Sequence, residues 1–577
     1  MNFRQAIIDG LVPLTQLPAE SISNLLEIPP QSELGDYAFP CFQLAKTMRK
    51  APAVIAADLA AQLGQSLTFI DRIATVGGYL NFFIDRSALI SQTIADTNAL
   101  QDQLGASDLG AGQTILVEFS SPNIAKPFHV GHAFTTILGN ALAKSYQHLG
   151  YHTIRLNHLG DYGTQFGKLI VAYKLWGDEA ALAAHPIQEL LRIYVRFHDE
   201  AKDKPELETE ARDQFRRLEE GQPEQVALWQ RFRDLSLQEF AVVYNRLGVT
   251  FDDYNGESFY SDQIPAVVDW LKTKNLLENS EGAQVVRLDE ENLPPCIILK
   301  SDGTTIYASR DIAAVLYREK TYNFAKNIYV VGTPQALHFK QVFAVLEKAG
   351  FEKAKDCCHV GFGLVKFADR KLSTRSGDVI LLEELLSESV DKTLEIIKSN
   401  AALRHPDMTE QDMREIAEKI GIGAVVFTFL KNGRERDIVF SWEEMLDFEG
   451  DSAPYVLYTY ARARSILRKA DLEGVNYLDC PAETLRLLGS DDEFALAKLL
   501  ESFGSTVEKS VSVHEPFMIV RLITNLARTF NKYYHHEPIL KTADPGLRTA
   551  RLALVSACST GIRAGLNLLG IQAVERM

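Results

Sequence analysis

The fold of this chain is decided by the stretch Glu118-Phe119-Ser120-Ser121-Pro122-Asn123-Ile124-Ala125-Lys126-Pro127-Phe128-His129-Val130-Gly131-His132. The apolar run Ile115-Leu116-Val117 before it predicts a buried strand. After it, apolar residues recur at helical spacing from Phe134 to Leu149, and Gly150 can end that helix. The stretch therefore joins a strand to a helix N-terminus, where free backbone N–H groups and the helix dipole favour an anion.

Two imidazoles, His129 and His132, lie at this predicted helix start together with Lys126. Gly131 between them lets the backbone approach a ligand closely. Such a cluster suits a nucleoside triphosphate whose α-phosphate is attacked. An isolated His-x-Gly-His more often means two surface histidines at a helix start, so the rest of the chain has to decide between these interpretations.

Composition is that of a globular protein, with 46% hydrophobic and 24% charged residues in a chain of 577. That length suggests roughly four domains. No apolar run reaches the ~18 residues of a membrane span, and the first residues lack the basic-then-apolar layout of a secretory signal, so we expect a cytoplasmic protein. The net charge of −16 argues against a non-specific polyanion binder. It leaves room for a local basic groove that binds RNA, and it suits a cationic small substrate.

The sequence argues against a zinc site and against the two common glycine-rich nucleotide-binding motifs. The six cysteines show no Cys-x-x-Cys spacing, which predicts reduced thiols and no zinc site. The first strand of the β-α-β unit is followed neither by Gly-x-Gly-x-x-Gly nor by a P-loop motif. Phosphates would therefore be held by the histidine pair, the helix N-terminus and a second basic loop.

Strand and helix patterns alternate after residue 113, which predicts parallel strands in an α/β domain. The sheet is expected to resume with Cys296–Lys300, in a hairpin that returns through Thr304–Ala308. At the N-terminus, the sequence predicts a turn at 34–40, helices around 42–63 and a strand at 78–84. The predicted domains are 1–107, 108–385 with a helical insertion at about 166–290, a helical connector at 386–450, and a helical domain at 451–577.

The sequence resembles the class I aminoacyl-tRNA synthetases, because His129-Val130-Gly131-His132 after a strand is similar to their HIGH signature. The resemblance to the arginyl-tRNA synthetases covers nearly the whole chain and is densest at 118–132, 304–311, 335–341 and 452–464. It implies an α/β fold: a Rossmann-like parallel-sheet catalytic domain, an N-terminal α+β accessory domain and a C-terminal all-α helical bundle. It also implies ligation of L-arginine to tRNA(Arg) through arginyl-adenylate, with ATP and Mg²⁺ as the substrate complex, no structural metal, and a monomer.

The second basic loop runs from Lys366 to Gly377 and resembles the KMSKS loop of that class. Two positions depart from the pattern, because Leu372 replaces Met and Thr374 replaces Lys. By resemblance, Lys371, Ser373 and Arg375 would neutralise the pyrophosphate leaving group, and either Lys126 or Arg375 would compensate for Thr374. Taken alone, the loop would be interpreted as an exposed basic turn.

A pocket for arginine needs acceptors, since a guanidinium presents five donors. The resemblance assigns Tyr307, Asp311 and Gln335 to the guanidinium, and Glu118 and Asn123 to the α-amino and carboxylate end. The alternatives are an Asp in the first turn of a helix and a Glu at a strand end paired with a lysine. A neutral apolar amino acid would not tolerate an unpaired buried carboxylate, so Asp311 with Tyr307 favours arginine over the neutral apolar substrates of other class I synthetases.

Two regions are expected to bind tRNA. By resemblance to the accessory domain that grips the tRNA elbow, Tyr79 would stack on a D-loop base and Asn81 would hydrogen-bond it; a buried tyrosine and a turn asparagine are the alternative. The C-terminal helices interleave aromatic and basic residues, which by composition fits an ordinary bundle and by resemblance an anticodon-binding domain. A non-catalytic tRNA-binding paralogue is the rival interpretation, and Thr374 is its best support.

Overall fold

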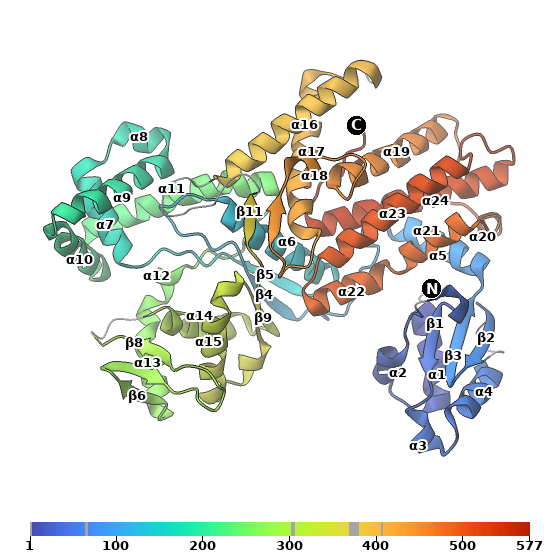
Figure 1. Cartoon of the computed structure of the whole chain (residues 1–577), viewed down its shortest axis with the longest axis horizontal. Helices are drawn as coiled ribbons and strands as arrows, with labels where there is room; N and C mark the ends of the chain where they lie inside the picture. The colour runs from blue at the N-terminus through green and yellow to red at the C-terminus, as the bar shows by residue number, and fades with distance from the viewer. Residues whose placement is uncertain are drawn as a thin grey trace.

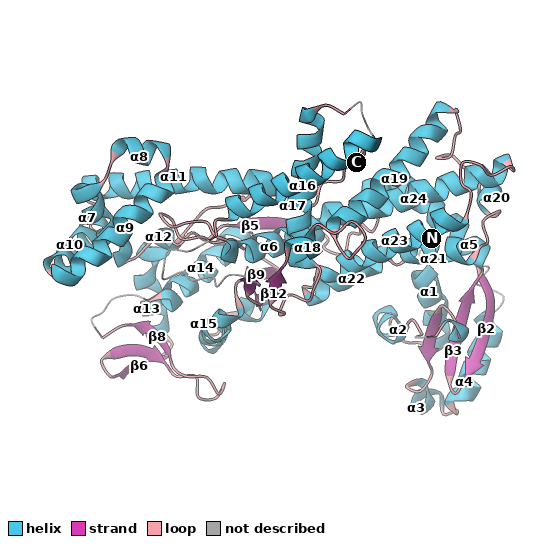
Figure 2. Ribbon diagram, turned by 45° about the horizontal axis from the view of Figure 1, so that its top comes forward, coloured by secondary structure: helices cyan, strands magenta, loops and turns pink. Residues whose placement is uncertain are grey.

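The computed structural model describes residues 3–29, 31–63, 67, 69–301, 306–367, 380–404 and 408–577. A small parallel sheet lies at the centre of an elongated molecule (Figure 1). A helical insertion extends from one side of this sheet, and a helical bundle with the N-terminal domain extends from the other. Within these ranges, the strands lie at the centre, in a corner below the insertion and in the N-terminal domain (Figure 2).

The central sheet has four parallel strands in the order β10-β9-β4-β5. Its apolar strand β4 is buried because α6 (Ala133–His148) covers one face, and α17 (Glu410–Leu430) and α24 (Pro545–Leu569) of the bundle pack against α6 in turn. The strand order reverses between β4 and β9, and ligands of such sheets bind beyond the carboxyl ends of the strands at that point. The predicted β-α-β unit is confirmed, with β4 (Thr114–Glu118), α6 (Ala133–His148) and β5 (His152–Leu156), followed later by β9 (Lys326–Val330) and β10 (Cys357–Val360).

The segment between β5 and β9 corrects two expectations. Cys296–Leu299 (β8) does not resume the parallel sheet: it joins a separate antiparallel sheet, β6-β7-β8, in which Cys296 and Ile298 are buried and Ile297 is exposed. The hairpin through Thr304–Ala308 is also wrong, because Tyr307 already begins a helix and Ser309 Oγ bonds the backbone of Ile306 at its start. Residues 302–305 lie outside the described ranges.

The helices of this segment are amphipathic or charged, as expected for an insertion that exposes much of its surface. Its elements are α7 (Thr164–Trp176), α8 (Glu179–Ala184), α9 (Pro186–Asp203), α10 (Glu206–Glu219), α11 (Pro223–Leu247), α12 (Glu257–Tyr260), η4 (Ser261–Gln263), α13 (Ile264–Thr273), β6 (Leu277–Ser280), β7 (Ala283–Val286), β8 and α14 (Tyr307–Tyr322). After β9 follow η5 (Thr333–Gln335), α15 (Ala336–Lys348) and η6 (Glu352–Asp356).

The N-terminal domain packs helices on an antiparallel sheet of order β1-β3-β2. The sequence predicted a turn at 34–40, but strand β1 begins at Tyr37 because it pairs with the predicted strand β3. The domain is docked on the bundle, where the Tyr37 hydroxyl donates to Glu501 at 2.8 Å and Lys498 pairs with Asp36 at 2.7 Å. Its elements are α1 (Phe3–Thr15), α2 (Ala19–Leu25), η1 (Ser32–Leu34), β1 (Tyr37–Pro40), α3 (Leu44–Met48), α4 (Pro52–Leu63), β2 (Ile70–Val76), β3 (Tyr79–Ile84), α5 (Arg86–Leu100) and η2 (Gln101–Gln103).

The C-terminal part is helical, as predicted, apart from a short parallel pair of β11 with β12. Its last helix, Pro545–Leu569, is the one helix of the described ranges long and apolar enough to cross a membrane, and 89% of its apolar window is buried inside the bundle. A Cβ on Gly565 would lie 2.2 Å from Ile523, so this glycine is needed where two helices approach. The elements are β11 (Val365–Phe367), α16 (Leu382–Arg404), α17 (Glu410–Leu430), β12 (Ile438–Phe440), α18 (Trp442–Met445), α19 (Ala453–Leu472), α20 (Ala482–Leu485), α21 (Asp491–Glu501), α22 (Phe503–Val513), α23 (Phe517–His536) and α24 (Pro545–Leu569).

Candidate active site

The loop between β4 and α6 is held in an unusual backbone conformation. Ser120, Ser121 and Ala125 have positive φ angles of 68°, 46° and 58°. Hydrogen bonds at Ser120 hold the loop in this conformation. The Ser120 N–H donates to Thr135 Oγ1 at 3.0 Å, and the Ser120 hydroxyl lies 2.8 Å from the hydroxyl of Tyr244. Strain that is fixed in this way clusters at functional sites.

Asn123 lies in the same loop, against the run that follows β5. It forms an isolated bridge with Gly160, and a Cβ on that glycine would lie 2.2 Å from Asn123 Oδ1. A side chain at position 160 would displace the Asn123 amide from this position, so glycine keeps it close to the run beyond the carboxyl end of β5.

His129 and His132 present the same edge of their rings. The N–H of Gly131 donates to His129 Nδ1 at 3.0 Å, and the N–H of His129 donates to His132 Nδ1 at 3.2 Å. Since Nδ1 accepts in both neutral rings, Nε2 carries the proton in both. Burial lowers the pKa of His129, and burial together with the neighbouring His129 lowers that of His132 to about 3. The pair thus supplies two neutral N–H donors at a helix start.

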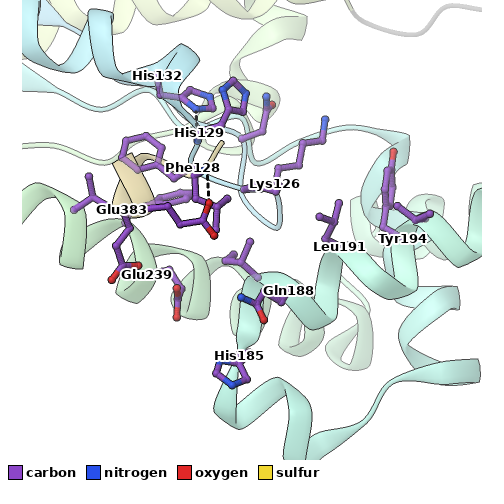
Figure 3. Close-up of a pocket in the computed structure, with 18 of the residues that line it drawn as sticks. Lys126, Phe128, His129, His132, His185, Gln188, Leu191, Tyr194, Glu239 and Glu383 are labelled. Carbon is purple, nitrogen blue, oxygen red and sulfur yellow. Dashed lines mark hydrogen bonds between the residues drawn. The ribbon is translucent and has the colours of Figure 1, made fainter. Parts of the chain in front are cut away.

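Lys126 and the two histidines line one cavity of about 1070 Å³ (Figure 3). Burial lowers the pKa of the Lys126 ammonium. The opposite wall comes from the insertion and from the start of α16, and it carries His185, Glu239 and Glu383. The cavity is lined by Asn123, Lys126, Pro127, Phe128, His129, His132, His185, Ile187, Gln188, Leu191, Tyr194, Val195, His198, Asp199, Lys202, Glu239, Phe240, Val243, Leu381, Glu383 and Glu384.

The chain after the second basic loop runs beside the histidines. Leu381 forms an antiparallel bridge with His129, the N–H of Val130 donates to Ile380, and that of Leu382 donates to Phe128. Before the loop, β11 pairs with β12. Lys371, Ser373 and Arg375 themselves lie outside the described residues.

Glu118, at the end of β4, is paired with an arginine that sequence reasoning missed. Arg318 Nη2 lies 2.5 Å from Glu118 Oε2, and both side chains are buried. A signal was available, because Arg318 continues the buried face of α14 after Ile312 and Val315. A charged residue on such a face calls for a buried partner.

The remaining candidates for the guanidinium end lie on α14 and at the start of α15. Asp311 Oδ2 lies 2.5 Å from His338 Nε2, a second residue that sequence reasoning missed. Tyr307 is 61% exposed, with the Arg310 guanidinium 5.0 Å from its ring centre, and Gln335 is exposed at the end of η5. These side chains and Glu118 are not part of the cavity around the histidines, whereas Asn123 is.

The two proposed tRNA-elbow residues differ in their exposure. Tyr79 is half-buried and meets Phe42 edge-on, with 5.3 Å between the ring centres. Asn81 is only 3% exposed, because β3 is the central strand of its sheet. Contact between Asn81 and RNA would require movement around this strand, and it stays a prediction.

A second cavity, of about 600 Å³, lies in the helical bundle. The Arg462 guanidinium lies 4.8 Å from the ring centre of Tyr458 and 5.2 Å from that of Tyr534. The C-terminal residue Met577 also lines this cavity, together with Met408, Asp412, Glu415, Ile416, Lys419, Ala461, Ser465, Ile466, Arg468, Lys469, Leu540 and Arg576. Within the part of the chain that the structure describes, no three His, Cys, Asp or Glu side chains group to hold a metal ion.

The parallel sheet, the strained loop and the paired imidazoles define a class I aminoacyl-tRNA synthetase, and residues 95–442 match the family model of the class I (R) catalytic domain. Residues 1–84 match the arginyl-tRNA synthetase N-terminal domain, and residues 456–577 the DALR anticodon-binding domain. The chain therefore belongs to the arginyl-tRNA synthetases, which confirms the resemblance and the fold class seen in the sequence.

Full-length relatives agree with this assignment. The chain is 52% identical to the arginine–tRNA ligases of Clostridium perfringens and Clostridium beijerinckii, with 100% of each chain covered. It is also similar to the structure of arginyl-tRNA synthetase from Thermus thermophilus, with a TM-score of 0.82 at 25% identity and 100% of both chains covered. The enzyme from Plasmodium falciparum shares the fold, with a TM-score of 0.80 at 23% identity and 99% of both chains covered.

Proposed function

We propose that this chain joins L-arginine to tRNA(Arg) in two steps, through an arginyl-adenylate. The observation that carries the proposal is the pair of neutral imidazoles, which offer Nε2–H donors beside Lys126 at a helix start. In the first step the arginine carboxylate attacks the α-phosphorus of ATP, and pyrophosphate leaves. In the second step the terminal ribose hydroxyl of tRNA takes the arginyl group, and AMP leaves.

His129 and His132 are proposed to donate to the α-phosphate as it gains negative charge. Fixed donors of this kind stabilise a transition state because they need no reorganisation during the reaction. Lys126 and the helix N-terminus add positive potential, and by resemblance Lys371, Ser373 and Arg375 meet the leaving pyrophosphate. Mg²⁺ would enter with ATP as part of the substrate rather than as a resident metal.

Arginine is proposed to lie beyond the carboxyl ends of β4 and β9. Asp311 would accept the guanidinium, with Tyr307 and Gln335 beside it, and Asn123 and Glu118 would hold the amino-acid end. The ion pair with Arg318 supports the role of Glu118, because it orients a buried carboxylate at the end of β4. The role of Asp311 is supported by its place on α14 and by its carboxylate, which is largely buried but still open to solvent, with 21% of the side chain exposed.

The tRNA is proposed to bind along both ends of the molecule. Tyr79 and Asn81 would meet the elbow, and the cavity of Tyr458, Arg462 and Tyr534 would take an unpaired anticodon base. Rings and a guanidinium that face one another offer a stacking surface for any base. The domain ranges 1–107, 108–385, 386–450 and 451–577, a monomeric state and a cytoplasmic location complete the proposal.

The test is to charge total tRNA with each amino acid separately, using the purified protein and Mg-ATP. Attachment of arginine alone is the expected result. Attachment of another amino acid would contradict the assignment of Asp311 and leave the fold untouched. Binding of tRNA without any charging would favour the non-catalytic paralogue.

A further inference from the structure

Asp311, the proposed guanidinium ligand, already has a partner in this structure. His338 Nε2 lies 2.5 Å from Asp311 Oδ2, and both side chains are partly open to solvent. A carboxylate can only accept, so Nε2 is the donor in this contact. A guanidinium that binds Asp311 side-on uses both carboxylate oxygens, and it would share one of them with His338.

Other charged and titratable groups of the described residues surround this pair and have contacts of their own. On α14, Arg310 lies over the ring of Tyr307, and on α12 Glu257 faces Arg310 with 3.7 Å between charged atoms. On β10, His359 bonds the carbonyl of Val331. Strands β9 and β8 contribute Tyr329 and Cys296, whose pKa values burial raises.

Burial by itself would lower the pKa of His338, and the hydrogen bond and charge of Asp311 outweigh it, so the net pKa is raised. The imidazolium is therefore favoured beside Asp311 while the pocket is empty. Substrate arginine brings a second cation to the same carboxylate. A guanidinium does not lose its proton in a protein, whereas an imidazole does so readily.

We propose that His338 is a positioning residue whose proton competes with substrate arginine for Asp311. Arginine binding then releases that proton, and neutral His338 keeps a hydrogen bond that orients the carboxylate. The inference rests on the proposed role of Asp311 as the guanidinium ligand. The protonation of His338 would make the binding of arginine depend on pH without acting on ATP or tRNA.

The direction in which the KM for arginine changes with pH follows from the raised pKa of His338. Below the pKa of His338 the imidazolium must be discharged before arginine binds, so the KM for arginine falls as pH rises, by up to roughly tenfold per pH unit. Above that pKa the KM becomes constant. Because the pKa of His338 is raised, the KM reaches its constant value only above the ordinary imidazole pKa of about 6.5.

The experiment measures the KM for arginine from pH 5.5 to 8.5 in tRNA charging with saturating ATP and tRNA. We compare the wild type with His338→Asn and His338→Gln, which keep an N–H donor and cannot be protonated. The expected result is a KM that falls with pH in the wild type and stays flat in both variants, so that at the acidic end the variants have the lower KM. The KM for ATP should stay within about twofold throughout.

Two control variants test whether the pH dependence belongs to His338. Burial raises the pKa of Glu257 to about 7, so Glu257→Gln removes a neighbour that titrates in the same range. His359→Asn removes the other nearby imidazole. Both controls should keep the pH dependence of the wild type.

A second readout counts the released proton directly. Calorimetry of arginine binding in two buffers of different ionisation enthalpy should show proton release near pH 6.5 in the wild type and less in His338→Asn. A flat profile in the wild type, or the same profile in the His338 variants, would overturn the inference while arginine charging still stood. A wild type that charges no arginine at any pH would instead overturn the proposed function.

Discussion

Glu118 and Arg318 form a buried ion pair across 200 residues of sequence, with 2.5 Å between Oε2 and Nη2. The pair joins the end of the central strand β4 to the inner face of α14, the helix that carries Tyr307 and Asp311. The proposed amino-acid pocket thus draws on two segments that this buried ion pair helps to hold together.

Replacement of Arg318 by Met should destabilise the fold, because it leaves a carboxylate buried without its counter-charge. A loss of about 3–5 kcal/mol in the free energy of unfolding is expected. Urea denaturation followed by circular dichroism measures it. The double variant with Glu118→Gln should recover part of the loss; a double variant as unstable as Arg318→Met would show that the two residues act separately.

Replacement of His132 by Asn should slow adenylate formation by about 10²–10³-fold, the cost of one transition-state donor. His132→Gln places an amide N–H nearer to the position of Nε2 and should restore part of the rate. Pyrophosphate exchange with tRNA present measures the step, and tRNA affinity should not change. Equal losses in rate and in tRNA affinity would contradict the assignment.

The neutral state of the histidine pair gives a pH prediction. Because the pKa of His132 is lowered to about 3, this ring should stay neutral and Nε2-protonated between pH 5 and 8. Nitrogen-15 NMR of labelled histidine should show one unshifted neutral signal for it over this range. A titration of His132 near pH 6.5 would contradict the hydrogen bonds that its Nδ1 and that of His129 accept.

Replacement of Asp311 by Ala should raise the KM for arginine far more than that for ATP. The loss of a desolvated charge pair is worth about 2–5 kcal/mol, and steady-state kinetics with either substrate varied measures it. Asp311→Asn keeps the size of the side chain and should give a large effect as well. Equal changes in both KM values would exclude Asp311 from the arginine pocket.

Replacement of Tyr534 by Leu should weaken binding of tRNA(Arg) by about 1–3 kcal/mol, the range for one base–aromatic stack. Leu472→Ser, on the exposed end of α19, is the matched control and should have no effect. When the anticodon of the tRNA is altered, Tyr534→Leu should weaken tRNA binding only slightly further. A full loss with that altered tRNA would place the residue outside the anticodon site.

The strand and the helix on either side of the histidine pair could be predicted from the local sequence. The apolar run 115–117 and the helical spacing after His132 predicted β4 and α6, and both are present. The error at Thr304–Ala308 arose because Ser301-Asp302-Gly303 carries a turn signal, whereas the start of α14 depends on the backbone bonds of Ser309. Cys296–Leu299 was correctly predicted as a strand and wrongly joined to the central sheet, because a short apolar strand does not specify its partner.

The sequence by itself determined which residues meet at the turn between β4 and α6, because a strand, a tight loop and a helix start are set by neighbours in the chain. The local pattern alone therefore places His129, Gly131 and His132 at a helix start. Only the tertiary structure decided that Glu118 meets Arg318, that Asp311 meets His338 and that Leu381 runs beside His129. These contacts join segments 27 to 252 residues apart. Burial and charge pairing select the first two and backbone hydrogen bonding the third, and all of these exist only once the chain has packed.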